Sequence, residues 1–418
     1  MTEHVLVLGV GYDIPARMRA FGAETGREVT TSVMCWPEHL EKTDDVPEHA
    51  RVLVLAPDAP VEEWIALART VHALTPITRI GSFYDDCRPQ AAAIARDLGL
   101  HTHTPEVVEI VLDKNAMRRR LAETDVEVTE SAVVADPVEV TAFAERVGYP
   151  CVVKPLTGAA SRGVSVLREP SGAAEALRRA TEALPDPRAL VEEYLDGPQF
   201  SVEAFSEDGE HVIAAVTRKY SEPVSLVELG HVMPAPLEPA DEAAVRAHVT
   251  ATLTALDIRF GPTHTEIILT PKGPRVIETH VRTGGDELFD MVTDATGVDM
   301  IECQLRQVLG EKVLPGIRAV LADPDRIRRA EAIWFAGAPT EGTLVEVLGA
   351  DADRPEHVTL TVSGKPGTRL TGLQNSFSRL AWARAHGPDA DSALTAARRT
   401  IEALTFVTRV PARTPDLL

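Results

Sequence analysis

The residues from Thr263 to Glu287, THTEIILTPKGPRVIETHVRTGGDE, predict two strands joined by a tight turn. Successive side chains of a strand point to opposite faces of the sheet. The second strand therefore carries Glu278, His280 and Arg282 on one face, while Glu266 lies on one face of the first strand. We take this hairpin as the element around which the rest of the chain is organised.

The turn sets the register of the hairpin. If the turn is a three-residue loop ending in Gly273, with Gly273 in the left-handed conformation, Thr270 pairs with Pro274 and Glu266 faces Glu278. Like charges directly opposite each other destabilise a sheet, and a divalent cation would remove that penalty. Two carboxylates together with phosphate oxygens are a usual way to hold Mg²⁺. Two carboxylates on a solvated sheet face are the alternative, and the hairpin alone does not decide between them.

Composition excludes several classes of partner. The 418 residues predict two to three domains, and 44% hydrophobic with 25% charged residues is typical of a soluble globular protein. A net charge of −21 argues against nucleic acid or an anionic membrane as partner. The four cysteines form no CxxC motif or zinc-type cluster, the N-terminus has no basic region, and no apolar run is long enough to span a membrane. We therefore expect a cytoplasmic protein.

The first part of the chain predicts a small open parallel sheet. His4–Val10 and Arg51–Ala56 are apolar runs that read as buried strands, and Pro60–Leu74 and Pro89–Leu98 have helical periodicity. Ile14 stands where a dinucleotide-binding GxGxxG fingerprint needs its third glycine, which argues against NAD binding.

Further strands and helices are predicted through the rest of the chain. The last predicted segment is antiparallel from about residue 330 and ends in a helix. We predict helices over 113–124, 136–147, 172–184, 241–256, 293–308 and 391–404, and strands over 130–134, 151–156, 164–167, 190–195, 200–206, 211–217, 330–336, 342–349 and 357–363.

A glycine-rich loop, TGAASRG at 157–163, follows a predicted strand. It has the GxxxxG of a P-loop, but Val164-Ser165 replaces Lys-Ser/Thr, so a Walker A motif is rejected. Its backbone N–H groups could still bind phosphate oxygens, with Ser161 and Arg162 as further donors. An ordinary exposed hairpin turn is the alternative.

Two of the chain's few lysines stand at unusual positions. Lys154 ends an apolar strand just before Pro155, and Lys114 begins a helix, where the helix dipole disfavours a cation. A bound polyphosphate would explain both placements. The alternatives are a snorkelling side chain for Lys154 and a simple exposed lysine for Lys114.

Taken in order, these residues resemble the ATP-grasp superfamily over most of the chain. The resemblance implies that Lys114 and Lys154 contact nucleotide phosphates under a lid at 157–163. VEEYLDGPQFSVE at 191–203 resembles the hinge that holds adenine. The implied ATP contacts are Lys114, Lys154, Ser161, Arg162, Gly163, Glu192, Glu193, Leu195 and Glu203.

The hairpin resembles the family's metal-binding motif. This implies that Glu266 and Glu278 hold Mg²⁺, for which Mn²⁺ could substitute, and that Arg282 stabilises an acyl phosphate. Arg282, Lys154 and Glu278 are the implied catalytic residues. His280 stands where many members have a metal-binding asparagine, and Gln199 stands where the hinge commonly has glutamate.

Within the superfamily, the chain most resembles one subgroup, the L-amino-acid ligases that make dipeptides. EThVRtGGDe around Arg282, GHVMPAPL at 230–237 and NSFSRL at 375–380 carry this likeness. It implies that His231, Arg282, Gly284 and Gly285 bind the amino-acid substrate. A histidine of the core or the surface is the alternative for His231.

The resemblance implies a multidomain α/β and α+β fold. We expect an N-terminal α/β domain at 1–110, a small lobe with the lid at 111–188, a large lobe with the metal site at 189–320, and an α+β domain at 321–418. The implied reaction forms an amide, expected to be a dipeptide bond, from amino-acid-like substrates. It consumes ATP with Mg²⁺, passes through an acyl phosphate and releases ADP and phosphate.

Other functions are kept open. An ATP-grasp carboxylase, or a ligase that joins an amino acid to a different kind of amine, is the alternative within the family. A nucleotide-binding scaffold with a dead site is disfavoured by the retained lysines, glutamates and arginine. Homodimers are common in the family, but no interface can be read from the sequence.

Overall fold

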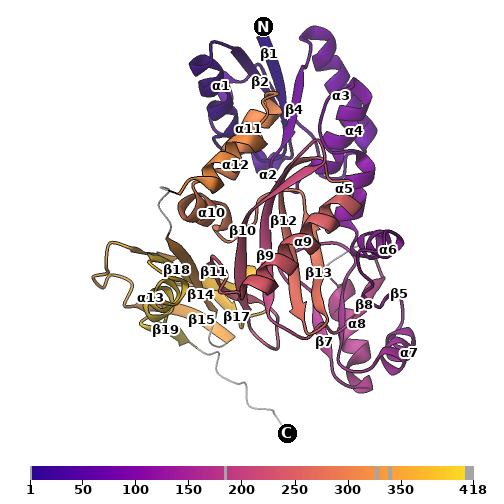
Figure 1. Ribbon diagram of the computed structural model, residues 1–418, viewed down its shortest axis with the longest axis vertical. Coiled ribbons are helices and arrows are strands. Elements are labelled where there is room, and N and C mark those ends of the chain that lie inside the picture. The colour runs from indigo at the N-terminus through magenta and orange to yellow at the C-terminus, as the bar shows by residue number, and fades with distance from the viewer. Residues whose placement is uncertain (1, 183–185, 325–328, 338–340, 410–418) are drawn as a thin grey trace.

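The computed structural model describes residues 2–182, 186–324, 329–337 and 341–409. These residues form one parallel and three antiparallel sheets with helices against them (Figure 1). The mixed α/β fold expected from the sequence is thus confirmed. No helix in the described part of the chain is both long and apolar enough to cross a membrane.

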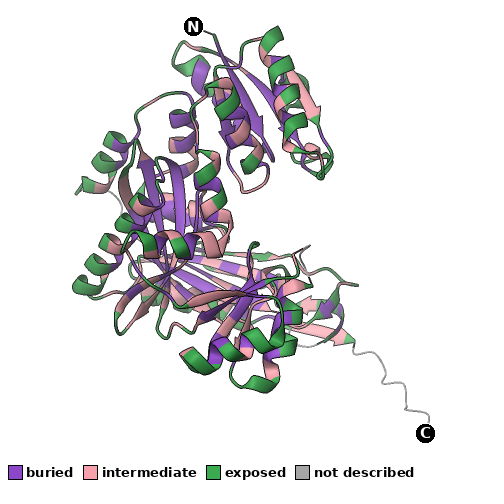
Figure 2. Ribbon diagram, turned by 90° about the vertical axis from the view of Figure 1, so that its right-hand side faces the viewer, coloured by how far each residue is buried: buried purple, intermediate pink, exposed green. Residues whose placement is uncertain are grey.

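The N-terminal sheet is parallel, with strand order β3-β2-β1-β4. Helices cover both faces of this sheet (Figure 2), and alternation along β1 divides its apolar side chains between them. Val5 and Val7 pack with α1 on one face, and Leu6 and Leu8 pack with α3 and α4 on the other. The elements are β1 (Thr2–Leu8), α1 (Ile14–Glu24), β2 (Glu28–Cys35), α2 (Pro37–Leu40), β3 (Arg51–Val54), α3 (Val61–Leu74), β4 (Arg79–Ser82) and α4 (Arg88–Leu98).

The second sheet is antiparallel, with order β5-β8-β6-β7, and α7 and α8 pack against it. Asp113 caps α6 as expected, because its carboxylate accepts from the N–H groups of Asn115 and Ala116. The elements are α5 (Pro105–Leu112), α6 (Lys114–Glu123), β5 (Ser131–Val134), α7 (Pro137–Val147), β6 (Cys151–Pro155), β7 (Ser165–Leu167), α8 (Ala173–Thr181) and β8 (Ala189–Glu193). The expected end of α8, at Leu184, lies outside the described residues.

An eight-stranded sheet, β13-β12-β9-β10-β11-β14-β18-β16, forms the centre of the molecule. Helices α5, α6 and α9 pack on one face, and α10 and α12 pack on the other. The elements are β9 (Gln199–Glu207), β10 (Glu210–Ser221), β11 (Glu228–Met233), α9 (Pro239–Ala255), β12 (Phe260–Thr270), β13 (Gly273–His280), α10 (Leu288–Thr296), α11 (Met300–Val308) and α12 (Leu314–Ala322).

The C-terminal strands belong to two sheets. β14, β18 and β16 extend the large sheet, whereas β15, β17 and β19 form a separate three-stranded one. The elements are β14 (Ala330–Gly337), β15 (Glu341–Leu348), β16 (Val358–Val362), β17 (Arg369–Thr371), β18 (Arg379–Gly387), α13 (Ala390–Glu402) and β19 (Thr405–Arg409). The helix over 391–404 was therefore wrongly expected to come last, since β19 follows it.

The helix predicted over 293–308 is two helices. Gly297, with φ of +77°, ends α10, and the Asp299 carboxylate caps α11 by accepting from the N–H of Glu302.

The bounds of the four expected domains stay a prediction. β8 begins at Ala189 but pairs within the second sheet, and the central sheet continues past residue 320.

The hairpin has a different turn from the one expected. Thr270 pairs with Gly273, not with Pro274, so the loop holds two residues. Gly273 does have a positive φ of +107°. A bulge at Ile277 then shifts the register by one residue, so that Glu266 still faces Glu278. The expected pairing of the two glutamates is therefore confirmed, although the turn from which it was inferred was wrong.

Candidate active site

A cavity of about 720 Å³ lies between the second sheet and the central sheet, within the size range of ligand pockets. Most of the predicted site residues line it: Lys114, Lys154, Ser161, Arg162, Glu192, Glu193, Leu195, His231, Glu266, Glu278, Arg282 and Gly285. Three predicted residues do not line the cavity: Gly163, Glu203 and Gly284. Glu203 reaches the site through His264, whose Nδ1 lies 2.7 Å from its Oε1.

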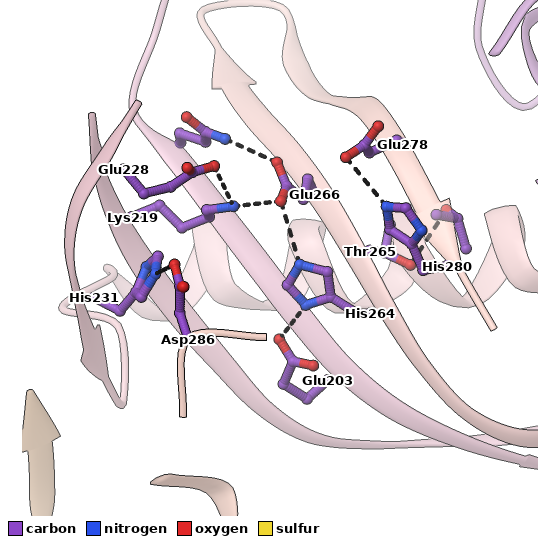
Figure 3. Close-up of polar contacts among 12 residues, drawn as sticks. Glu203, Lys219, Glu228, His231, His264, Thr265, Glu266, Glu278, His280 and Asp286 are labelled. Carbon is purple, nitrogen blue, oxygen red and sulfur yellow. Dashed lines mark hydrogen bonds and ion pairs between the residues drawn. The ribbon is translucent and has the colours of Figure 1, made fainter. Parts of the chain in front are cut away.

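Glu266 and Glu278 face each other on β12 and β13 within this cavity (Figure 3). Glu266 forms an ion pair with Lys219 and accepts a hydrogen bond from Gln199 Nε2 at 3.0 Å. His264 Nε2 lies 3.3 Å from the same carboxylate. Gln199, noted in the sequence as a departure from the family pattern, therefore holds one of the two carboxylates.

Glu278 lies between two cationic groups. Lys114 Nζ is 3.1 Å from its Oε2, and His280 Nε2 is 3.1 Å from its Oε1. Burial raises the pKa of Glu278, but Lys114 and His280 outweigh this effect and hold the pKa well below its usual value. Burial likewise raises the pKa of Glu266, and Lys219 and His264 lower it by more. Both carboxylates are therefore ionised at neutral pH.

These carboxylates fit a divalent cation. No group of three or more His, Cys, Asp or Glu residues in the described ranges is arranged to hold a metal ion by itself. Mg²⁺ takes oxygen ligands and usually completes its shell with waters and substrate phosphates, so two opposed carboxylates suffice. The nearby Lys219 and Lys114 balance the carboxylate charges.

His280 lies between two carboxylates. Its Nε2 faces Glu278, and its Nδ1 lies 3.5 Å from Asp85 Oδ2. Burial lowers the pKa of His280, but the two carboxylates raise it by more, which favours the imidazolium. An imidazolium donates at both nitrogens and has no lone pair for a metal. His280 thus differs in chemistry from the asparagine expected at this position.

Lys154 and Glu192 belong to a buried ion network that the sequence did not indicate. Lys154 Nζ is 2.6 Å from Glu192 Oε2, and Arg118 Nε donates to Glu192 Oε1 at 2.7 Å. Arg118 Nη1 lies 3.4 Å from Glu127, which also accepts from the N–H of Val276 at 2.9 Å. The Glu192 carboxylate faces Lys154, and its expected contact with adenine or ribose stays a prediction.

Replacing Glu192 by glutamine is expected to lower the free energy of unfolding by about 3 kcal/mol, because two buried cations lose their carboxylate. Burial raises the pKa of Glu192, but Arg118 and Lys154 bring it from 4.5 to about 2. Since the folded-state pKa is the lower one, this stabilisation is complete above pH 4.5 and is lost as the pH falls toward 2.

Urea unfolding of both proteins from pH 6 to pH 3.5 measures this effect. The difference between wild type and Glu192→Gln should shrink as the pH falls. Glu193→Gln, which alters a partly exposed neighbour whose carboxylate accepts from the N–H of Glu130, should cost less than about 1 kcal/mol. Equal losses in the two variants would contradict the network.

The loop 157–163 lies over the cavity and is held from three sides. Lys114 Nζ donates to Gly158 O at 2.8 Å, and Ser161 Oγ donates to Leu226 O at 3.1 Å. The N–H of Ser376 donates to Ala160 O at 3.4 Å. The loop therefore touches both the central sheet's β10–β11 connection and the C-terminal part of the chain.

The far end of the cavity joins three distant segments. His231 Nε2 is 3.1 Å from Asp286 Oδ2, as Figure 3 shows. Arg379, at the start of β18, holds both oxygens of Asp286 and stacks 3.8 Å from the centre of the Phe335 ring. The sequence reading missed Asp286 and Arg379, although both lie in motifs quoted there: GGDe and NSFSRL.

Arg282 lines the cavity beside the carboxylate pair, but it was wrongly expected on the second strand, because β13 ends at His280. Its Nε donates to Asp85 Oδ2 at 2.5 Å, and its Nη1 donates to Thr283 O at 2.8 Å. Asp85 comes from the N-terminal domain, 197 residues away in sequence. No sequence signal marked it.

Family models match two parts of the chain. The model described as "ATP-grasp domain" matches residues 147–290, which include Lys154, the loop 157–163 and the whole hairpin. The model described as "L-amino acid ligase C-terminal domain 2" matches residues 334–409.

Similar proteins agree with these matches. An uncharacterized protein of Sinorhizobium fredii, y4rH, is 30% identical over 85% of this chain and 73% of its own length. Alanine–anticapsin ligase of Bacillus subtilis is 26% identical over 60% of this chain, and the match spans 57% of that ligase. The crystal structure of L-amino acid ligase from Bacillus licheniformis has a TM-score of 0.79 at 19% identity, over 97% of this chain and 99% of that one.

Proposed function

This chain belongs to the ATP-grasp family of ligase-type enzymes, and on that basis we propose that it joins two amino acids, or close analogues, into a dipeptide. One observation carries the proposal. Glu266, Glu278 and Arg282 meet in one cavity with Lys114 and Lys154. Two carboxylates, two lysines and an arginine are the parts that phosphoryl transfer to a carboxylate needs.

The proposed reaction has two steps. A substrate carboxylate oxygen attacks the γ-phosphorus of ATP and ADP leaves, which gives an acyl phosphate. An amine nitrogen then attacks the acyl carbon, phosphate leaves, and the nitrogen loses a proton. Mg²⁺ held by Glu266 and Glu278 would supply charge neutralisation at the phosphates during the first step.

The protein's own residues bind and orient. Lys114, Lys154 and Arg282 line the cavity. In the proposed reaction the two lysines would contact the nucleotide phosphates, and Arg282 would bind the carboxylate and then the acyl phosphate. The loop 157–163, already in contact with Leu226 and Ser376, would exclude water that otherwise hydrolyses the acyl phosphate. Histidine, serine and cysteine nucleophiles have no part in this scheme.

The choice of amino acids as substrates rests on the C-terminal segment. Ser376, Phe377 and Arg379 form part of the cavity wall and lie within the region that matches the L-amino acid ligase model. Asp286 and Glu228 also line that end of the cavity, where Asp286 is paired with Arg379 and His231, and Glu228 with Lys219.

Phosphate release from ATP and Mg²⁺ in the presence of all pairs of the common amino acids tests this function, with mass spectrometry of the products. We expect release that needs two amino acids, with a dipeptide as product. Release that needs bicarbonate would instead identify a carboxylase. Release with one amino acid and an unrelated amine would identify a different carboxylate–amine ligase.

A further inference from the structure

Asp85 is the one residue of the N-terminal domain that forms an ion pair with the β13 side of the cavity, among the ion pairs found in the described residues. It follows β4, at the carboxyl end of the parallel sheet, the edge where open parallel sheets bind their ligands. The loop after β4 thus reaches from one domain into the site of another.

The Asp85 carboxylate makes a three-way contact. Its Oδ2 accepts from Arg282 Nε at 2.5 Å and lies 3.5 Å from His280 Nδ1. Its Oδ1 lies 3.9 Å from Nε of Arg88, an arginine that is 3% exposed. Arg88 is itself fixed, because its Nη2 donates to Tyr84 O at 3.0 Å. The buried Arg88 guanidinium therefore lies near one oxygen of the Asp85 carboxylate, while the other oxygen faces the cavity residues Arg282 and His280.

These contacts leave one edge of the Arg282 guanidinium free. Nε is occupied by Asp85 and Nη1 by Thr283 O. Nη2 has no hydrogen-bond partner among the described residues. An arginine has three rotatable bonds beyond Cβ, so a fixed Nε determines the plane of the guanidinium and the direction of its free N–H groups.

We propose that Asp85 is a positioning residue that fixes the Arg282 guanidinium, and with it His280, so that the N–H groups of Nη2 point to the site of the substrate carboxylate. The N-terminal domain then contributes to catalysis through this contact. The kinetic consequence of this inference rests on the proposed function, whereas the fixed orientation of Arg282 does not.

Losing Asp85 should affect chemistry more than nucleotide binding, because Lys114, Lys154 and the hinge do not contact it. Replacing Asp85 by alanine is expected to lower kcat about 10- to 100-fold, the effect of one charge-assisted hydrogen bond, while KM for ATP changes less than about twofold. Asp85→Asn, which keeps the size of the side chain, should lower kcat in the same direction with a smaller effect.

A double-variant cycle separates positioning from a general structural role. If Asp85 acts through Arg282, then Asp85→Ala should cause no further loss of kcat in an Arg282→Ala protein. Asp86→Ala is the matched control, because Asp86 is the next residue but its carboxylate lies 3.4 Å from His39 and is away from the cavity. The control should keep wild-type kcat and KM.

Crystal structures of wild type and Asp85→Ala give a readout that does not depend on the reaction. We expect the main chain to superpose and the Arg282 side chain to take other rotamers or lose its density. An unchanged Arg282 in that structure, wild-type kcat in Asp85→Ala, or additive losses in the double variant would each overturn the inference. A wild-type protein that ligates no pair of amino acids would overturn the proposed function, and the crystal structures would still decide the role of Asp85.

Discussion

Glu278→Gln is expected to lower kcat for product formation about 10²- to 10³-fold, with the fold retained. The amide keeps the shape of the side chain but removes the charge that faces Lys114 and His280 at 3.1 Å each. It also removes one of the two carboxylates proposed to hold Mg²⁺. Initial rates of ADP release, with Mg²⁺ varied at saturating ATP, measure the loss.

The Mg²⁺ dependence makes this prediction specific. The variant should need a higher Mg²⁺ concentration for half-maximal rate than the wild type. Glu210→Gln is a matched control, because Glu210 begins β10 at the surface, where it pairs with Arg318 at 2.7 Å. A Glu278→Gln protein with wild-type rate and Mg²⁺ dependence would remove Glu278 from the metal site.

Arg282→Ala is expected to lower kcat roughly 100-fold or more, the second large effect. The variant loses the guanidinium that is placed beside the carboxylate pair, and it leaves Asp85 with Arg88 and His280 as partners. ATP binding should persist, because the lysines of the cavity are unchanged. Single-turnover ADP formation and ATP affinity by calorimetry measure the two quantities separately.

Arg275→Ala serves as the control for Arg282→Ala. Arg275 lies on β13, the strand that ends at His280 just before Arg282, but its Nη1 donates to Pro274 O and it does not line the cavity. Its replacement should change kcat by less than about twofold. Wild-type turnover from Arg282→Ala, or equal losses from both arginines, would show that Arg282 has no special role.

Local patterns predicted the parts of the fold that local forces decide. The apolar runs of β1 and β3 and the helical periods of α3 and α4 predicted the open parallel sheet. The break at Gly297 was missed, although Gly at a helix end and Asp299 at the next helix start are both recognised signals. The continuation of the central sheet through β18 was missed because strand pairing between distant segments leaves no local pattern.

The hairpin shows how a correct contact can follow from an incorrect turn. The loop is one residue shorter than expected, which by itself would have moved Glu278 out of register with Glu266. The bulge at Ile277 restores the pair. A bulge adds one residue without changing the composition of a strand, so alternation alone does not reveal it.

Cavity residues that belong to a sequence motif were predicted. Cavity residues that the fold brings in singly from distant parts of the chain were missed. Lys114, Lys154 and the hairpin glutamates, which line the cavity, were singled out because each stood in an unusual local setting. Arg118, Lys219 and Asp85 were not, because a charged residue on a helix, strand or loop looks ordinary until its burial and its distant partner are known. Such long-range ion pairs require the three-dimensional fold.

Transfer of ¹⁸O from a labelled amino-acid carboxylate to phosphate tests the central claim most directly. If the carboxylate attacks the γ-phosphorus of ATP, the bond broken in the second step lies between the acyl carbon and its oxygen. Each phosphate released should then carry one ¹⁸O atom, and the dipeptide should have lost one, by mass spectrometry. Phosphate without label, or label found in AMP, would contradict an acyl phosphate and with it this account of the site.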